Sequence, residues 1–462
     1  MNDSPPPGRS VPIWFFLFCC LGWSLATVVF GWAVWSTMVG SEKTGQAGRI
    51  ALEIARFPPK AKAAVLEVVS LIDGDYEDEQ LRVRRDADAD YTGFTPVAAA
   101  AGIDVQGLSM RADLGALTRG WRVLIGAFRV DGRIQNAALL LSPDLKIVKT
   151  WSLVERPLGD VEPRPAYRKF VHGFELLPDG SAVFTFDGSV SLQRVDACGD
   201  LLWGTPGDFH HAVTLSESGQ TVWTFSQDDA IAEVSVADGR ILQALSLEEM
   251  IAANPTIDVL ELRRVHDNDL NGNSRDTTGK WLGEPIHFND VDPLPSAIAD
   301  RFDQFAAGDV VISSRSLNLV FVVDPASGEI KWWRVGATQR QHDPDWLATG
   351  EISVLNNRMS RDYSEIVAID PSTFRSRVLF DGRKNGFYTR IRGKHQMLPD
   401  GDMIVTSPQQ GRAFEIGPTG ETVLEIVNQR PGDAPFNYVI SEMRWLAPDY
   451  LEPAGWRCGL AE

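Results

Sequence analysis

Hydrophobic and polar residues follow three different patterns along the chain. From Val11 to Val39 no charged residue occurs, and an apolar run of this length can cross about 30 Å of hydrocarbon as a tilted helix. Between Ile50 and Leu71 apolar residues recur at helical spacing around Pro58-Pro59, which predicts a short helical stalk in two pieces. After about residue 118 short β-rich runs alternate with Pro, Asp and Gly turns, which is typical of an all-β repeat protein.

The β-rich region repeats one unit of four short runs. The unit that begins at His395 reads HQML, PDG, DMIVTS, PQQG, RAFEIG, PTG and ETVLEIV, in which turns separate the four runs. Similar units begin at His172, His211, His287 and His342, and a sixth, without the histidine, occupies 119–153. Six such units predict a six-bladed β-propeller, and we expect residues 436–446 to return and close its ring.

These patterns divide the chain into four parts. We expect a signal anchor or transmembrane helix at 1–40, a helical and acidic linker at 41–117, the propeller at 118–451 and a tail at 452–462. Two long insertions, at 245–286 and 292–307, lie on either side of His287, and long insertions in a compact fold are often functional loops.

Charge and cysteine content narrow the function classes. The 62 acidic residues outnumber the 44 basic ones and give a net charge of -18, which argues against a nucleic-acid partner because phosphate backbones are bound by clustered Lys and Arg. The apolar run exceeds the roughly 7–15 residues of a signal peptide's apolar region, which favours an uncleaved anchor with the N-terminus inside and the large domain outside. Cys198 and Cys458, the two cysteines beyond the anchor, can form a bridge in an oxidising compartment if their Cα atoms approach.

The histidines are the main candidates for chemistry. All seven lie in the repeat region, and five of them stand at the entry to the first strand of a unit, so we expect their side chains to converge at one mouth of the propeller. Arg315 stands between two strands of the unit that His287 begins, where a guanidinium can hold an oxyanion. Neutral imidazoles can carry protons or act as nucleophiles. The site therefore suits metal-free transfer of an anionic group, although a histidine repeated for hydrogen bonding between strands would give the same pattern.

One loop resembles a calcium site. Asp267, Asp269, Asn271 and Gly272 have the early offsets of an EF-hand loop, but Thr278 stands where a bidentate Glu is needed,. An irregular calcium loop or a solvated loop remains, and no other cofactor is expected.

Four segments of the repeat region resemble the bacterial arylsulfotransferase family. They are HFNDVDPLP at 287–295, ISSRSLNLVFVVDPASGEIKWW at 312–333, RQHDPDWLATGEISVLNN at 340–357 and GKHQMLPDGDMIVTS at 393–407, within a resemblance that covers about residues 165–430. Proteins of this family are membrane or periplasmic six-bladed propellers that move a sulfuryl group from a phenolic sulfate to a phenol without a nucleotide donor. The resemblance implies an aryl sulfate and a hydroxyl acceptor as partners, and a single-pass protein of the bacterial inner membrane with its propeller in the periplasm.

The resemblance also implies roles for individual residues. His342 resembles the nucleophile that becomes a sulfohistidine, and Arg315 the residue that binds the sulfuryl oxygens. His287 resembles a second site histidine, and His211 or its neighbour His210 a third that stabilises or protonates the phenolate oxygen. His395 and Asn289 are expected among the substrate-binding residues. The chain departs from the family at Asn356-Asn357-Arg358, where an acidic-Asn-Gly turn is common.

A second function class fits the same repeats. A non-catalytic, membrane-anchored propeller would bind a partner protein or an anionic glycan at the same mouth. The enzyme hypothesis requires His342, Arg315 and His287 to gather within reach of one ligand, whereas a binding module has no such requirement.

Overall fold

The chain forms two compact units, Met1–Tyr76 and Glu77–Glu462. The computed structural model describes residues 12–38, 46–48, 50–55, 81–86, 89–158, 170–187, 189–226, 230–266, 279–281, 286–430, 436–452 and 456–458. The predicted calcium loop with Asp267, Asp269 and Asn271 lies outside these residues, as does most of the predicted stalk.

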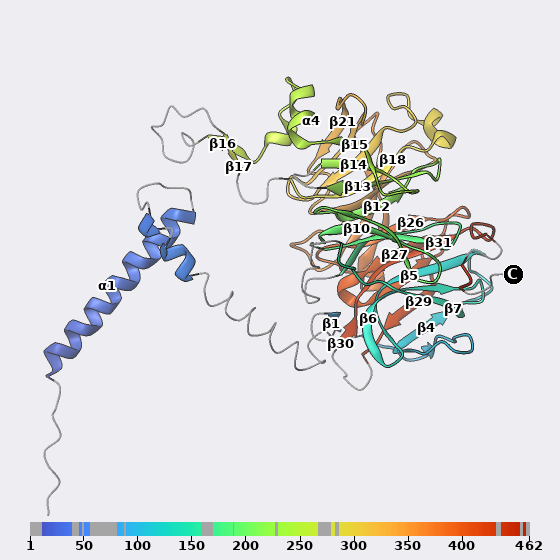
Figure 1. Ribbon diagram of the computed structural model, residues 1–462, viewed down its shortest axis with the longest axis horizontal. Helices are drawn as coiled ribbons and strands as arrows, with labels where there is room; N and C mark the ends of the chain where they lie inside the picture. Colours follow the sequence, from blue (N-terminus) through green and yellow to red (C-terminus); the bar gives the residue numbers. More distant parts are fainter. Residues whose placement is uncertain are drawn as a thin grey trace, which may run out of the picture. The chain divides into compact units, whose positions relative to one another are not determined.

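The first unit contains the predicted apolar helix. Helix α1 runs over Ile13–Met38 (Figure 1), and its segment Ile13–Thr37 is long and apolar enough to cross a membrane. Large apolar side chains on it are exposed, among them Trp14, Leu21 and Trp23. Exposure of this kind fits a lipid environment, because a helix that is apolar all round has to be buried in protein or in a bilayer.

The second unit is a six-bladed β-propeller, as predicted, and four of its blades are regular four-stranded antiparallel sheets. The first is β8 (Val171–Leu176), β9 (Ala182–Phe186), β10 (Ser191–Val195) and β11 (Leu201–Pro206). The second is β12 (His210–Leu215), β13 (Thr221–Ser226), β14 (Ala230–Ser235) and β15 (Ile241–Leu245). The third is β18 (Phe288–Pro293), β19 (Val310–Ser314), β20 (Leu319–Val323) and β21 (Ile330–Val335). The fourth is β22 (His342–Trp346), β23 (Ile352–Asn356), β24 (Glu365–Ile369) and β25 (Ser376–Asp381).

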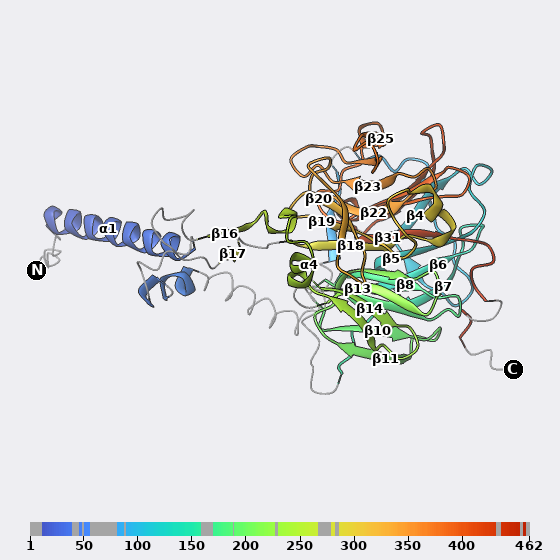
Figure 2. The same ribbon diagram turned by 90° about the horizontal axis from the view of Figure 1, so that it is seen from above.

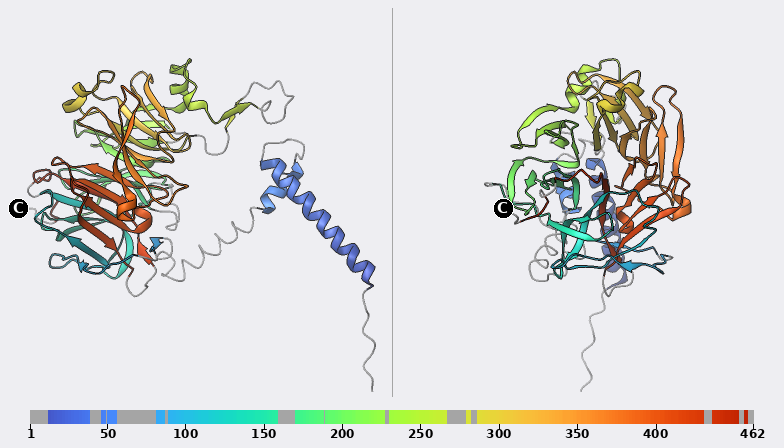
Figure 3. Two further views of the ribbon diagram at one scale, coloured as in Figure 1. Left: turned by 180° about the vertical axis from the view of Figure 1, so that it is seen from behind. Right: turned by 90° about the vertical axis from the view of Figure 1, so that its right-hand side faces the viewer.

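Two further blades contain strands from distant parts of the chain. One joins β26 (Lys394–Met397), β27 (Met403–Ser407), β28 (Arg412–Ile416) and β29 (Thr422–Asn428) to the early strands β4 (Leu108–Ala112) and β2 (Thr95–Pro96). The other joins β5 (Trp121–Val130), β6 (Arg133–Leu141) and β7 (Ile147–Ser152) to β3 (Val105–Gln106) and the C-terminal β31 (Ile440–Leu446). The predicted return of residues 436–446 is thus confirmed, because β31 pairs with β5 and closes the ring (Figure 3, right).

The remaining elements are short. They are β1 (Arg82–Arg84) paired with β30 (Phe436–Tyr438), the hairpin β16 (Arg264–His266) and β17 (Gly279–Trp281), helix α4 (Leu247–Ala253), and the 3-10 turns η4 (Val259–Glu261), η5 (Ser296–Arg301), η6 (Gly382–Asn385) and η7 (Pro408–Gln410). Strands β1 to β4 correct the boundary predicted at residue 118, because they pair with strands of the propeller.

The burial of the strands explains why they could be predicted from apolar runs in the sequence. Every residue of the middle strands β19, β20 and β23 is buried, because neighbouring blades cover both faces of each sheet. Figure 2 views the propeller from its side, with β19 and β20 of one blade next to β22 and β23 of the following blade. Such strands appear as continuous apolar runs. Between β5 and β28, in the two blades that contain distant strands, Arg122 and Glu415 form an ion pair 2.8 Å long whose two side chains are fully buried.

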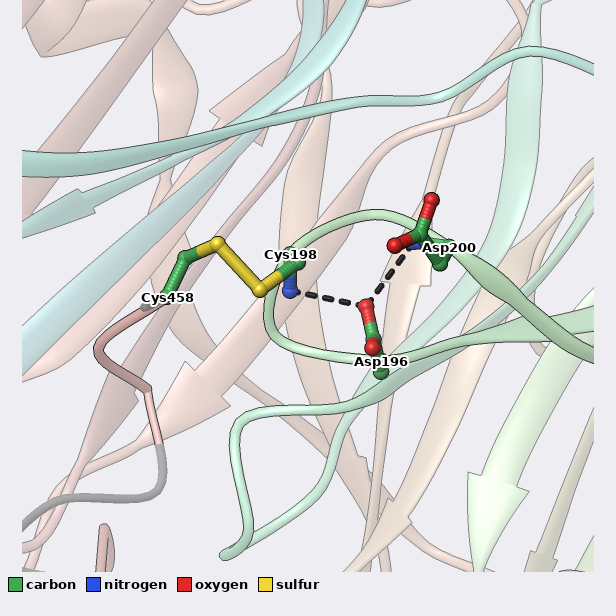
Figure 4. Close-up of a disulfide and its surroundings, with 4 residues drawn as sticks. All are labelled: Asp196, Cys198, Asp200 and Cys458. Atoms are coloured by element: carbon green, nitrogen blue, oxygen red, sulfur yellow. Dashed lines mark hydrogen bonds between the residues drawn. A yellow bond between two sulfur atoms is a disulfide. The ribbon is translucent and has the colours of Figure 1, made fainter. Parts of the chain in front are cut away.

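A disulfide fastens the C-terminal tail to the propeller. Cys198, in the turn between β10 and β11, is bonded to Cys458, with Cα atoms 4.8 Å apart and 260 residues between them in sequence (Figure 4). The carboxylate of Asp196 stabilises the turn by accepting hydrogen bonds from the backbone N–H groups of Cys198 and Asp200. The tail predicted at 452–462 is therefore cross-linked to a blade far from it in sequence.

We expect the paired substitution Cys198→Ser and Cys458→Ser to lower the free energy of unfolding by about 2–5 kcal/mol, the usual cost of removing a native disulfide. Denaturant unfolding of the full-length protein in detergent measures it. Replacing Cys19 and Cys20 of α1, which are free, is the control. If reductant changed the free energy of unfolding equally in the wild type and in the paired variant, the expectation would be contradicted.

Candidate active site

The innermost strands begin irregularly where the predicted site residues lie. His342 is the first residue of β22 and His210 the first of β12, and His287 directly precedes β18. Each strand has a shift of register at its start, and His211 and His287 have left-handed φ angles of 66° and 52°. Bulges and left-handed residues redirect side chains at a cost of about 1–3 kcal/mol per strained residue. The strained backbone at these strand entries therefore lowers stability but orients the imidazoles.

Four imidazoles form one cluster. Nδ1 of His210 lies 2.6 Å from Nδ1 of His211, and Nε2 of His211 lies 3.2 Å from Nε2 of His287. The ring of His172 lies against that of His211, with centroids 4.2 Å apart. Burial lowers the pKa of both His172 and His211 well below the usual histidine value, and the neighbouring histidines, together with Arg392 in the case of His172, disfavour a further positive charge. These two rings are therefore neutral near pH 7.

A backbone hydrogen bond connects Arg315 to the same cluster. It follows β19, and its N–H donates to the carbonyl of His287 over 3.1 Å. Gln341, directly before the predicted nucleophile, donates from Nε2 to Ser313 and Ser314 of β19 and to Leu319 of β20. The turn that carries Arg315 is thus fixed between the entries of two neighbouring blades.

Asn289 belongs to the same framework. Its Nδ2 donates to the carbonyl of Gln341 over 2.8 Å, and its Oδ1 has no hydrogen-bond partner among the described residues. Asn289, His172 and His342 line a cavity of about 20 Å³, which is enough for one water molecule.

The hydrogen bonds of His342 define its protonation state. Nδ1 lies 2.7 Å from Oδ1 of Asn357, while Nδ2 of Asn357 donates to the carbonyls of Thr389 and Arg392. Since both amide donors are used, Oδ1 is the atom turned to the ring and Nδ1 carries the hydrogen. The backbone N–H of Arg392 donates to Nε2 over 3.1 Å, which requires a lone pair there.

Electrostatics keep that lone pair free of a proton. Burial is the main cause that lowers the pKa of His342 to about 3; the hydrogen bond to Asn357 acts in the opposite direction, and the charges of His287, Arg315 and Lys394 lower the pKa further. His210, His211 and His287 lie in one cluster with His172, and Arg315 is bonded to His287 through its backbone N–H. His342 and Asn289 join this cluster where they line one cavity with His172.

His395 lies in a different environment. Its Nδ1 is 2.7 Å from Asp343, and its Nε2 is 2.8 Å from Ser353; the carboxylates of Asp345 and Asp343 raise its pKa above the ordinary value against the effect of burial. It lines a separate cavity of about 330 Å³. The expectation that all five of these histidines converge at one mouth therefore fails for His395. Its strand β26 pairs with β27 without a register shift, whereas β8, β12, β18 and β22 have such a shift at their start, and a shift of one residue changes the face on which a side chain lies.

Asp343, Asp345 and His395 offer ligand atoms within 4.8 Å of one another. Internal contacts already use these atoms: Nζ of Lys394 lies 2.8 Å from both Asp343 and Asp290, and both ring nitrogens of His395 are hydrogen-bonded. A metal ion here would have to displace these partners.

Three residues of the candidate site, one in the cluster and two that contact His342, were not predicted as site residues. His172 was visible in the sequence through its place at the start of a unit. Asn357 stood at the departure from the family's turn, but nothing in the sequence connects it to His342. Arg392, whose guanidinium pairs with Asp187 over 2.7 Å, gave no signal.

Comparison with known proteins gives one informative match. The family model described as arylsulfotransferase (ASST) matches residues 173–429, more than half of the chain. No curated protein matches it. Among solved structures, a protein of unknown function from Bacteroides caccae is 12% identical, with a TM-score of 0.44 over 70% of this chain and 98% of that one. A catalytically inactive virginiamycin B lyase from Staphylococcus aureus, solved with quinupristin, is 10% identical, with a TM-score of 0.41 over 73% of this chain and 98% of that one.

Proposed function

Since the chain belongs to the arylsulfotransferase family, we propose that it moves a sulfuryl group from an aryl sulfate to a phenolic or other hydroxyl acceptor through a sulfohistidine on His342. The observation that supports this proposal best is the pair of hydrogen bonds on that ring, which places the hydrogen on Nδ1 and the lone pair on Nε2. A neutral, buried imidazole with a fixed tautomer is suited to attack at Nε2.

The two half-reactions follow from this arrangement. In the first, Nε2 of His342 forms a bond to sulfur as the bond from sulfur to the aryl oxygen breaks, and the phenolate leaves. In the second, the acceptor hydroxyl attacks the same sulfur, loses its proton and releases His342. The guanidinium of Arg315 is suited to the sulfuryl oxygens because it offers a planar fork of donors.

Donor binding has to displace one contact. The backbone N–H of Arg392 occupies the Nε2 lone pair, and this residue has a left-handed φ of 63°, followed by Gly393 at 107°. A segment held in left-handed conformations gains from relaxation, so replacement of this hydrogen bond by the approaching sulfur is accompanied by a shift of this segment.

The proposal is tested with the full-length protein in detergent, an aryl sulfate donor labelled on sulfur, and phenol. We expect labelled phenyl sulfate as product and, when phenol is omitted, label bound to the protein in an acid-labile, alkali-stable form, as expected for an N–S bond. Absence of transfer from every aryl sulfate tried would overturn the function. Transfer without labelled protein would overturn the covalent route alone.

Arg315→Lys should lower kcat/KM by about 10²–10³-fold, which is typical of removing one donor from a preorganised anion site. Lysine keeps the charge but cannot offer the paired N–H groups. Steady-state kinetics measure the change, and Arg334→Lys on the outer strand β21 is the matched control. Unchanged kinetics in Arg315→Lys would remove this residue from the site.

We also propose that α1 anchors the protein in the bacterial inner membrane with the propeller in the periplasm. The support is the disulfide, since such bonds persist in oxidising compartments and are rare in the cytosol,. Cleavage of the propeller by protease added to spheroplasts is the expected result, and protection of the propeller would contradict this orientation.

A further inference from the structure

The side-chain ammonium of Lys394 connects the innermost strands of three blades. Lys394 is the first residue of β26, and its Nζ lies 2.8 Å from a carboxylate oxygen of Asp290 in β18 and 2.8 Å from one of Asp343 in β22. The side chains of both aspartates are only 5% exposed, and that of Lys394 is 22% exposed. One buried cation is thus shared by two carboxylates from neighbouring blades.

The two aspartates directly follow residues of the candidate site. Asp290 comes after Asn289, and Asp343 comes after His342. The register of β18 and that of β22 shift at these positions, and Asp343 has a left-handed φ of 57°. A residue other than glycine keeps this conformation only where its surroundings support it. Lys394 therefore contacts the two strand irregularities that orient Asn289 and His342.

No other lysine or arginine of the described residues forms an ion pair with either carboxylate. The second oxygen of Asp290 accepts the backbone N–H of Val291 over 3.0 Å, and the second oxygen of Asp343 accepts hydrogen bonds from the backbone and Nδ1 of His395. Burial acts to raise the pKa of Asp343, but the charge of Lys394 and the hydrogen bond from His395 outweigh burial and keep this pKa below its usual range. Removal of the ammonium would leave two buried carboxylates beside each other without a lysine or arginine partner.

Lys394 also lies between two cavities. It lines the cavity of about 20 Å³ together with His342 and Asn289, and it lines the cavity of about 330 Å³ together with His395. The larger cavity has the acidic side chains of Glu175, Asp290, Asp292, Asp343, Asp345 and Glu442 in its wall. The ammonium thus places a positive charge between these carboxylates and the residues at which an anionic donor is proposed to react.

We propose that Lys394 is a positioning residue for the sulfuryl transfer: its ammonium keeps the strand entries that carry Asn289 and His342 in place relative to each other and offsets the charge of Asp290 and Asp343. The inference rests on the proposed function, because it concerns the rate of attack by His342. It does not require Lys394 to touch the substrate. Displacement of reacting groups by about 1 Å lowers a rate by on the order of 10²-fold, so loss of the ammonium should lower kcat.

The test removes the ammonium and then supplies it again in solution. In the full-length protein in detergent, Lys394→Ala leaves a space that adjoins the larger cavity, and we expect kcat with an aryl sulfate to fall by about 10²-fold. Propylammonium, which has the shape and charge of the deleted group, should restore part of the lost kcat, whereas neutral propanol should not. Lys394→Met keeps an apolar stem of similar length that fills the space, so it should show the same loss without restoration.

Lys331→Ala is the matched control. Nζ of Lys331, on the outer strand β21, pairs with Asp309 over 2.7 Å, and the two side chains are 23% and 4% exposed. Both alanine variants leave a buried carboxylate without its lysine and should lower the denaturant midpoint, but Lys331→Ala should leave kcat within about twofold of wild type. Equal losses of kcat in the two variants, no loss in Lys394→Ala, or an equal response to propylammonium and propanol would overturn the positioning role.

A second measurement does not depend on turnover. ¹⁵N NMR of the His342 ring should show the hydrogen on Nδ1 in the wild type, shifted ring resonances in Lys394→Ala, and their return when propylammonium is added. Unshifted resonances would also overturn the inference. A wild type that transfers from no aryl sulfate but shows this reversible shift would overturn the sulfotransferase function and leave the positioning of His342 by Lys394 intact.

Discussion

Replacement of His342 by glutamine should lower sulfuryl transfer by on the order of 10⁴-fold or more, because loss of a covalent nucleophile removes the reaction path itself. Glutamine can still bond to Asn357, so the local fold is preserved. The measurement is double: turnover of a chromogenic aryl sulfate, and labelled protein after exposure to donor without acceptor. Both should vanish together.

A matched control is available in His266→Gln, which removes an imidazole from the separate hairpin β16–β17 and should leave turnover within about twofold, as is usual for substitutions away from a site. Retention of labelled protein in His342→Gln would move the nucleophile to another residue of the cluster. Retention of turnover without label would exclude a covalent intermediate altogether.

The low pKa of His342 also predicts how stability and rate respond to pH. Its folded pKa is about 3, whereas an unfolded histidine takes its proton near 6.5. Between these values the unfolded chain binds more protons, so this residue's contribution favours folding above about pH 6.5 and is lost as the pH falls toward 3. The nucleophile remains unprotonated throughout, so His342 should give the rate no acid limb near pH 6.5. His342→Gln should lose less stability than wild type between pH 7 and 4.5.

The propeller and several residues of the candidate site could be predicted from the sequence, and the burial of the strands is the physical reason. Strands such as Leu319–Val323 are buried on both faces and cannot accept polar residues, so each repeat appears as an apolar run between turns. Strands at the edge of a sheet are under no such constraint: Thr95–Pro96 is exposed and Val105–Gln106 partly so, and the segment that carries them was predicted to be a linker.

The positions of the histidines show where the sequence becomes insufficient. The repeat placed His395 and His342 at the entry to the first strand of their units, yet the ring of His395 faces Asp343 and that of His342 faces Asn357. A bulge of one residue reverses the face of a side chain, and the bulges here depend on left-handed residues that no composition rule selects. Convergence of His287, Arg315 and His342 could be proposed from the repeat, whereas the orientation of each ring depends on partners from neighbouring strands.

Asn357→Leu is expected to have the second-largest effect, a loss of about 10³–10⁴-fold in kcat, which is comparable to losing tautomer control in other imidazole-dependent enzymes. Leucine has the same branched shape, although it is larger, and it cannot accept the Nδ1 hydrogen. Only the hydrogen bond from the backbone N–H of Arg392 then opposes a shift of the ring hydrogen to Nε2, and the approaching donor has to displace that bond, so the ring can lose the lone pair that attacks sulfur. KM should change little, because the amide is committed to His342, Thr389 and Arg392. ¹⁵N chemical shifts of the His342 ring report the tautomer directly.

The neighbouring Asn356 separates this effect from simple loss of stability. It is equally buried, and its amide bonds to Glu365 and to the backbone N–H of Gln339 without touching the imidazole. Each leucine variant therefore leaves buried polar groups unpaired and should cost about 1–3 kcal/mol of stability, but only Asn357→Leu should lower kcat. Equal kinetic losses in the two variants would reduce Asn357 to a structural residue. A loss of kcat in Asn357→Leu alone, with the ring hydrogen found on Nε2, would show that the amide of Asn357 holds His342 in the tautomer that can attack sulfur.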